Sequence, residues 1–113
     1  GAKRGNGKKI LQKMRVVWTT EAMKSYYETL DYWDEHNGSN SYSIKIMTAI
    51  DVLIKELVED PYFLGQYDEQ LNLHRRTILK GRFLIYYEIK DAESTIEIQY
   101  FRSSYQKPLS SYN

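Results

Sequence analysis

Residues 41 to 60 carry the pattern that most narrows the fold of this chain. Apolar residues recur three and four positions apart from Ile46 to Val58, which is the spacing of one broad helical face. Ser41 or Ser43 can cap the start, and Pro61 ends the pattern because the residue before a proline disfavours helical geometry. The sequence therefore predicts an amphipathic helix that must bury its apolar stripe against another layer.

A second helix is predicted just before this one, over about residues 20 to 36. Thr19 or Thr20 can serve as its N-cap, and Asn37 and Gly38 stop it. Its apolar stripe contains Met23, Tyr26, Tyr27, Leu30 and Trp33. Two neighbouring amphipathic helices joined by a short connection predict a helical hairpin.

The remaining segments favour strands. Residues 14 to 18, "MRVVW", form a short β-branched and aromatic run, and similar runs cover about 73 to 79, 82 to 90 and 94 to 101. Short connections make the last three runs an antiparallel meander, whereas residues 61 to 72 lack a period and predict a loop. The predicted fold class is α+β, with the order strand, two-helix hairpin, three-stranded meander, and with the helices packed on one face of the sheet.

Alternation along the last strand assigns its side chains to two faces, because successive residues point to opposite sides of a sheet. The face predicted to contact the helices holds Ile96, Ile98 and Tyr100. The opposite face then holds Glu97, Gln99 and Phe101. By the same rule Arg75 and Arg76 point to opposite sides, so at most one of them meets the helices.

Length and composition limit the function classes. A chain of 113 residues forms one domain, and with no Cys and two His it offers no disulfide framework, metal site or cofactor site. No apolar run reaches the roughly 18 residues of a membrane span, and the start lacks the apolar core of a signal peptide. We expect a cytoplasmic domain over residues 14–108, a basic tail over 1–13 and a C-terminal tail over 109–113.

The net charge of +1 conceals separated patches. Residues 1 to 15 carry six cations and no acid, and residues 20 to 60 carry nine acids against three lysines. Four cations without an acid then fall in residues 75 to 82. Such asymmetry indicates binding partners, because local fields steer association while net charge hardly constrains topology.

The stretch "RRTILKGRFLIYY", residues 75 to 87, is the strongest candidate for a binding surface. Arginine presents a rigid fork of donors suited to phosphate oxygens, and nearby aromatic rings offer stacking faces. The competing interpretation is that the cations are ordinary solvated side chains and that the rings belong to the core. The candidate anion-binding or target-binding residues are Arg75, Arg76, Lys80, Arg82, Arg102 and Lys107. Lys80, Arg82 and either Arg102 or Lys107 are expected to converge at the end of the hairpin.

Sequence motifs of the common catalytic classes are missing. There is no Cys nucleophile, no GxSxG, no phosphate-binding loop and no HExxH, so covalent acyl transfer and zinc hydrolysis have no support. His74 beside Arg75 is expected to titrate in solvent or to cap a strand edge, with general acid or base work as the alternative. His36 lies at a predicted helix end, where a cation is favoured.

Three stretches together resemble the RelE/ParE superfamily of type II toxins, especially its ParE-like plasmid-stabilisation branch. They are "MRVVWTTEAMKSYYETLDYW", "DPYFLGQ" and "GRFLIYYEI…IEIQYFRSSYQKP", within about residues 14 to 108. The resemblance implies a small toxin held inactive by a cognate antitoxin, with which it can form a heterotetramer. ParE-like members poison DNA gyrase without being enzymes, whereas RelE-like members cleave messenger RNA on the ribosome.

Under the RelE-like alternative the resemblance assigns roles to particular residues. Arg75, Arg82 and Arg102 would orient the phosphate and stabilise its charge, and Tyr105 or Tyr112 would transfer protons. The register departs from that pattern, because "RFLIYYEI" has one residue more than expected between Arg82 and its last aromatic residue. Tyr105 also stands where ParE-like sequences often carry an arginine. Three interpretations follow: a ParE-like toxin that acts by binding, a RelE-like ribosome-dependent mRNA endonuclease, and a binding module that is not toxic or is a decayed toxin.

Overall fold

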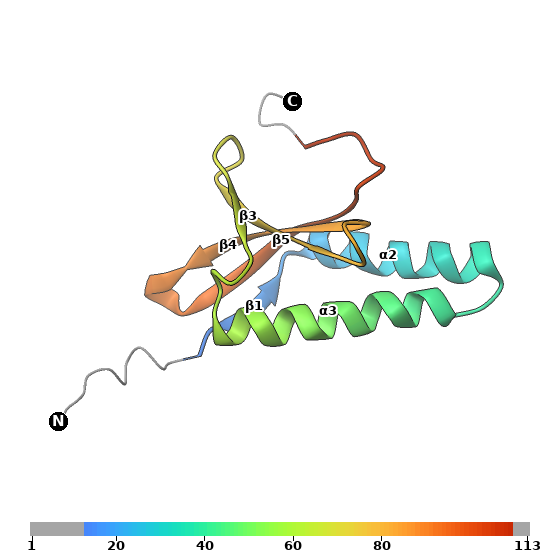
Figure 1. Ribbon diagram of the computed structural model, residues 1–113, viewed down its shortest axis with the longest axis horizontal. Coiled ribbons are helices and arrows are strands. Elements are labelled where there is room, and N and C mark those ends of the chain that lie inside the picture. Colours follow the sequence, from blue (N-terminus) through green and yellow to red (C-terminus); the bar gives the residue numbers. More distant parts are fainter. Residues whose placement is uncertain (1–12, 110–113) are drawn as a thin grey trace.

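The computed structural model describes residues 13–109 and has an α+β architecture, with two helices and a five-stranded sheet (Figure 1). The predicted fold class is confirmed at this level. The predicted tails, residues 1–13 and 109–113, lie outside the described residues except for Lys13 and Leu109.

The sheet has the strand order β1-β5-β4-β3-β2. The predicted meander is formed by β3 (Leu73–Ile78), β4 (Phe83–Lys90) and β5 (Thr95–Ser103), which pair antiparallel. The predicted first strand, β1 (Arg15–Trp18), lies parallel to β5 at one edge. A short 3-10 helix, η1 (Asp91–Glu93), connects β4 to β5.

A strand within residues 61 to 72 was not predicted. The segment contains β2 (Gln66–Asp68), which pairs antiparallel with β3 at the other edge of the sheet. At three residues β2 is too short to show an alternating pattern, so its pairing with β3 defines it more than its own sequence does.

The two helices begin and end close to the predicted positions. Helix α2 (Thr20–Asn37) is capped by Thr19, whose side chain accepts a hydrogen bond from the amide of Ala22 at 3.1 Å, and Gly38 ends it at φ 64°. Helix α3 (Ser41–Glu59) has Asn40 at its N-cap position, without a capping side-chain hydrogen bond. The prediction of Ser41 or Ser43 as cap is therefore wrong. Ser43 instead donates to Asp34 at 2.5 Å, which ties α3 to α2.

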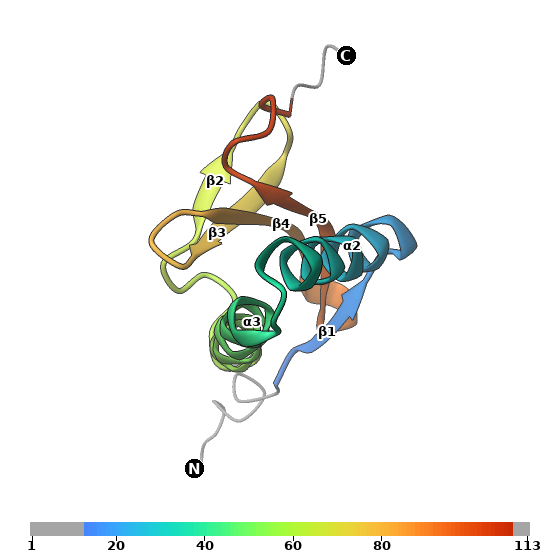
Figure 2. The same cartoon turned by 90° about the vertical axis from the view of Figure 1, so that its right-hand side faces the viewer.

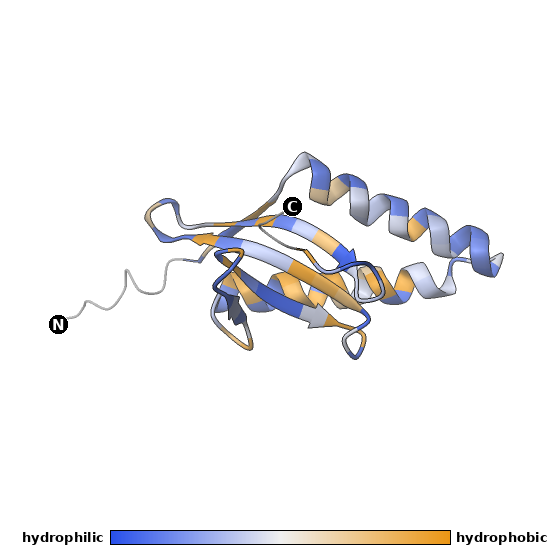
Figure 3. Cartoon of the chain, turned by 90° about the horizontal axis from the view of Figure 1, so that it is seen from above, coloured by the Kyte–Doolittle hydropathy of each residue, from blue (hydrophilic) through white to orange (hydrophobic). Residues whose placement is uncertain are grey.

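Both helices lie on one face of the sheet, as predicted (Figure 2). Their apolar stripes meet alternate residues of β4 and β5, whereas the outer sides of the helices carry many hydrophilic residues together with some exposed apolar ones (Figure 3). The largest completely buried side chains in this core include Tyr87, Phe83 and Phe101. The helices therefore cover only this face, and on the opposite face Tyr86 is buried while Tyr100 is partly exposed.

The predicted alternation along β5 fails after Ile98. Phe101 is buried at 1% exposure, whereas Tyr100 is 38% exposed, the reverse of the prediction. The pairing with β4 explains this, since Tyr86 lies opposite Tyr100 while the next residue, Tyr87, lies opposite Ile98. Gln99 is thus an extra residue, and a bulge of this kind reverses the faces of the residues that follow it.

Candidate functional site

The predicted cations come from β3, from the β3–β4 turn, from the end of β5 and, for Lys107, from the exposed segment that follows β5. Arg75 and Arg76 do point to opposite sides of the sheet. Arg76 faces the helices and is 9% exposed, whereas Arg75 is half-buried on the other face. The structure therefore separates the two adjacent arginines, as strand geometry requires.

Arg76 is engaged by the protein itself. Its guanidinium forms an ion pair with Glu56 of α3 and donates a hydrogen bond to the carbonyl of Phe63 at 3.1 Å. The same group lies 5.8 Å from the centre of the Phe63 ring. Because a buried charge needs its partners, Arg76 holds the segment after Pro61 against α3 and is not a free anion-binding group.

Arg82 occupies a different environment, framed by aromatic rings. It follows a turn in which Leu79, Lys80 and Gly81 have φ values of 51°, 57° and 83°. Its guanidinium carbon lies 5.5 Å from the ring centre of Trp33, 5.9 Å from that of Tyr42 and 5.1 Å from that of Tyr105. These distances permit cation–π attraction to residues from α2, α3 and the C-terminal segment.

Arg82 has guanidinium N–H donors that are available to a ligand. Within residues 13–109 its guanidinium makes one hydrogen bond, to the hydroxyl of Tyr42 at 3.3 Å. A guanidinium carries five N–H donors and cannot be deprotonated in a protein. An anionic group that entered beside Arg82 would therefore meet unused donors on a side chain that is already positioned.

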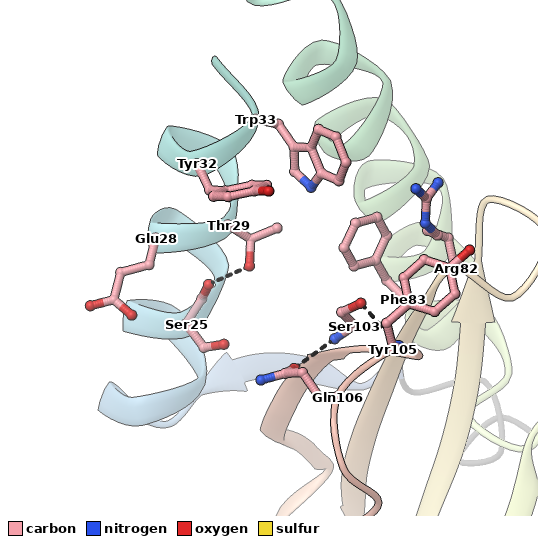
Figure 4. A pocket seen from close by; sticks show the side chains of 10 residues that line it. All are labelled: Ser25, Glu28, Thr29, Tyr32, Trp33, Arg82, Phe83, Ser103, Tyr105 and Gln106. Carbon is pink, nitrogen blue, oxygen red and sulfur yellow. Dashed lines mark hydrogen bonds between the residues drawn. The ribbon is translucent and has the colours of Figure 1, made fainter. Parts of the chain in front are cut away.

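A groove of about 510 Å³ lies between α2, the start of β4 and the turn after β5 (Figure 4). Arg82 and Tyr105 stand on one side of it, and Tyr32 and Trp33 extend into it from α2. Glu28 adds one negative charge to the α2 wall. The groove thus combines one available guanidinium with several aromatic surfaces.

Tyr105 is presented by a turn that closes through its own side chains. The amide of Ser103 donates to the Gln106 side-chain oxygen at 2.9 Å, and the amide of Tyr105 donates to Ser103 Oγ at 3.1 Å. Tyr105 itself is 80% exposed. Its ring and hydroxyl are therefore accessible to a partner at the mouth of the groove.

Arg102 lines a smaller hollow of about 190 Å³ beside the start of α2. Ser25 and Gln106 line both this hollow and the larger groove, so the two cavities adjoin. Arg102 also donates a hydrogen bond to the carbonyl of Lys107, which draws the C-terminal segment back toward β5. Arg82 and Arg102 therefore border two different cavities that adjoin each other.

Arg75 and Lys80 do not join these cavities. Arg75 lies on β3 opposite Tyr86, away from the helices, and donates to the side chain of Gln66 on β2. Lys80 lies in the β3–β4 turn, and its side chain is not among those that line either cavity. Strand β4 separates Arg75 from Arg102 on β5, and the two are also offset by two residues along the strands, so their backbones are more than about 10 Å apart. The predicted cations therefore do not surround a single point.

His74 does not project freely into solvent, contrary to the expectation for it. Its ring stacks on Tyr87 with centroids 5.7 Å apart and meets Tyr62 and Tyr67 edge-on at 5.6 Å and 4.9 Å. Burial in this cluster lowers the pKa of His74. The residue is therefore a packing element between β3 and the segment that precedes it, and lies apart from the groove.

Trp33 and Tyr42 are the residues around Arg82 that sequence reasoning missed. Trp33 belongs to the apolar stripe of α2 and was assigned to the core, and Tyr42 was not singled out. Arg82 lies 40 residues beyond Tyr42, and no local spacing reveals that the β3–β4 turn meets the end of the helical hairpin where α2 connects to α3. Their shared aromatic character was the one available signal.

The chain matches no protein-family model and no curated protein at a significant level. Within residues 13–109, neither helix is both long and apolar enough to cross a membrane. The same residues hold no group of three or more His, Asp or Glu side chains arranged to bind a metal ion.

Proposed function

We propose that this protein is the toxin of a type II toxin–antitoxin pair of the RelE/ParE superfamily, that it binds and inhibits DNA gyrase without catalysing a reaction, and that a cognate antitoxin neutralises it. The family assignment rests on the resemblance of the three quoted stretches. The order strand, two helices, antiparallel meander, with both helices on one face of the sheet, is consistent with it.

The observation that carries the non-enzymatic mechanism is the dispersal of the arginines. Cleavage of RNA requires several charged groups directed at one phosphate. Here Arg76 is held by Glu56, and Arg75 lies on β3 with its side chain tied to Gln66. One arginine, Arg82, remains in the main groove, and it is surrounded by rings. Such an arrangement suits recognition of a protein surface more than charge stabilisation on a nucleic acid.

The groove has the composition that protein interfaces favour. Arginine, tryptophan and tyrosine contribute disproportionately to binding energy at the centre of an interface. Arg82, Trp33 and Tyr105 come together here from three separate segments, and Tyr105 is exposed. An acidic or carbonyl-bearing loop of the target could place an oxygen on Arg82 while its apolar atoms cover the rings.

The test is inhibition of purified gyrase together with translation of a defined messenger, each with wild-type protein and with Arg82→Ala. We expect wild-type protein to inhibit supercoiling and to leave the messenger intact. Arg82→Ala should weaken inhibition by about 10- to 100-fold, because loss of an arginine hot spot at an interface costs roughly 2 kcal/mol or more. Lys80→Ala, which removes a neighbouring cation outside the groove, is the matched control and should retain wild-type inhibition.

Normal supercoiling at saturating wild-type protein would rule out this target. If in addition neither growth nor translation changes, the protein is a binding module without toxicity. Circular dichroism of the Arg82→Ala variant separates loss of binding from loss of folding.

One observation favours a second candidate, a ribosome-dependent mRNA endonuclease. The Arg82 guanidinium lies 5.1 Å from the Tyr105 ring centre, and Arg102 borders the adjoining cavity. An arginine beside an accessible phenol is a pair that can stabilise a phosphate and move a proton. Cuts in messenger at the ribosomal A site that vanish in Tyr105→Phe would establish this activity in place of gyrase inhibition.

The antitoxin part of the proposal is tested through the gene adjoining this one. Co-expression should yield a complex in which the product of that gene restores growth, with a heterotetramer as the expected assembly. Independent elution of the two proteins, or continued growth arrest on co-expression, would contradict the pairing.

A further inference from the structure

An exposed apolar hollow lies on the outer side of the C-terminal half of α3, apart from the groove at Arg82. Its volume is about 470 Å³. It is lined by Val52, Lys55, Glu56, Glu59, Asp60 and Phe63. Val52 is 51% exposed and Phe63 is 45% exposed, and the adjacent Leu64 is 68% exposed. Exposed apolar side chains that lie together in a hollow offer a surface that another apolar segment can cover.

Specific contacts fix the segment that carries Phe63 and Leu64 and keep its apolar side chains exposed. The carbonyl of Phe63 accepts a hydrogen bond from Arg76 at 3.1 Å, and Leu64 has a left-handed backbone with φ of 56°. A left-handed conformation is unfavourable for a leucine and persists where surrounding contacts fix it. The apolar side chains therefore project from a segment anchored to the core.

The charges around the hollow call for a cationic occupant. Glu56, Glu59 and Asp60 stand at the C-terminal end of α3, where the helix macrodipole is already negative, and no basic residue lies in the last turn of this helix. Lys55 and Arg76 supply two positive charges against these three acids. Without the N-terminal segment the rim retains one net negative charge beside the helix end, and Lys13 of that segment is the first cation to approach it.

The N-terminal segment of the same chain reaches this place. Lys13 forms an ion pair with Glu59 at 3.1 Å, and the amide of Met14 donates to the carbonyl of Val58 at 3.4 Å. The residues just before Lys13 read "KKILQ", two cations followed by two large apolar residues. Five extended residues span about 17 Å, whereas Val52 and Glu59 are about 10 Å apart along the helix.

We infer that residues 8–12 bind this hollow within the same molecule. Ile10 and Leu11 cover Val52 and Phe63, and Lys8 and Lys9 face the acids at the end of α3. The segment then shields the apolar hollow from solvent and also compensates the negative C-terminal end of α3. This inference gives the basic N-terminus a role that does not depend on toxin activity.

The chain contains no cysteine, so an engineered cysteine pair reports on this contact without interference. We expect the Leu11→Cys/Val52→Cys protein to form an intramolecular disulfide at least about tenfold faster than Leu11→Cys/Ala92→Cys, a difference that corresponds to a modest docking free energy. Ala92 is the matched control, because it is exposed and the backbone near it, at Ser94, bonds to Arg15. The segment can therefore reach it.

Two further variants complete the test. Ile10→Ser/Leu11→Ser should shift the amide resonances of Val52 and Phe63. Adding Lys8→Glu/Lys9→Glu to the Leu11→Cys/Val52→Cys protein should slow its disulfide formation toward the control rate. Equal rates for the two cysteine pairs would overturn the inference. Disulfides between molecules would overturn it in favour of a second copy as occupant, and unchanged resonances would overturn it as well.

Discussion

At Arg76 a charged side chain is a structural component of the core. It is 9% exposed, and its partners are Glu56 on α3 and the carbonyl of Phe63. The neighbouring Arg75 has the same chemistry but lies on the opposite face of the sheet with Gln66 as its partner. One position along a strand thus decides whether an arginine pairs with a helix in the core or with a neighbouring strand on the opposite face.

This contrast predicts different costs for two alanine substitutions. Arg76→Ala should lower the free energy of unfolding by about 2 kcal/mol, less than for a completely buried pair because the Glu56 side chain is 36% exposed. Arg75→Ala should change it by less than about 0.5 kcal/mol. Urea denaturation of both variants measures the difference.

The double variant Arg76→Ala/Glu56→Ala controls for the carboxylate left without its partner. It should be less destabilised than the sum of the two single variants. Equal stability of Arg75→Ala and Arg76→Ala would refute the assigned role of the ion pair.

Among the elements, the helices were the most predictable from sequence. Their apolar periodicity, the Thr19 cap, and the stops at Gly38 and before Pro61 are local signals, and α2 and α3 agree with them within a residue or two. The three strands of the meander were also predicted. Local pattern suffices where an element's own residues determine its conformation.

The end of β5 was not predictable in the same way. Gln99 becomes an extra residue because β4 and β5 pair in two registers on either side of it, and that property belongs to two strands together. The consequence reaches the candidate site, since Arg102 and Ser103 follow the bulge. The meeting of Arg82 with Trp33 and Tyr42 likewise depends on packing between distant segments, which a single sequence does not display.

The segment between α3 and β2 makes a further prediction possible. A Cβ atom on Gly65 would lie 2.7 Å from the hydroxyl of the completely buried Tyr87. Gly65→Ala should therefore cost about 1–3 kcal/mol of unfolding free energy through overpacking. Thermal or urea unfolding measures it.

Tyr87→Phe is the diagnostic partner for this substitution. By itself it removes the hydrogen bond to the carbonyl of Pro61 and should cost about 1 kcal/mol. Combined with Gly65→Ala it removes the clashing oxygen, so the double variant should be more stable than additivity requires. Strict additivity would show that the contact between these two residues does not limit the substitution.

For the whole molecule, burial of three titratable groups limits the pH range of stability. Burial lowers the pKa of His74, and it raises the pKa of Tyr26 and Tyr87 to about 12 each. Below about pH 6.5 the unfolded chain takes up a proton at His74 more readily than the folded chain does, so stability falls as the pH drops. Above about pH 10 the unfolded chain loses phenolic protons first, so stability falls as the pH rises toward about 12.

We therefore expect the free energy of unfolding to be highest between about pH 7 and 10. His74→Gln is the control for the acid side. It removes the ionisable ring, so residue 74 should no longer contribute to the pH dependence of the free energy of unfolding between about pH 5 and 7. If the free energy of unfolding falls equally below about pH 7 in the wild type and in His74→Gln, the loss of stability is due to the carboxylates and not to His74.

The contact of Arg82 with Trp33 and Tyr42 joins the β3–β4 turn to the end of the helical hairpin where the chain reverses direction. A guest that draws the guanidinium toward itself must loosen it from the indole and from the phenol on the other helix. Occupancy of the groove is therefore linked to the flexibility of the α2–α3 connection. The fluorescence of Trp33 should report whether the groove is occupied.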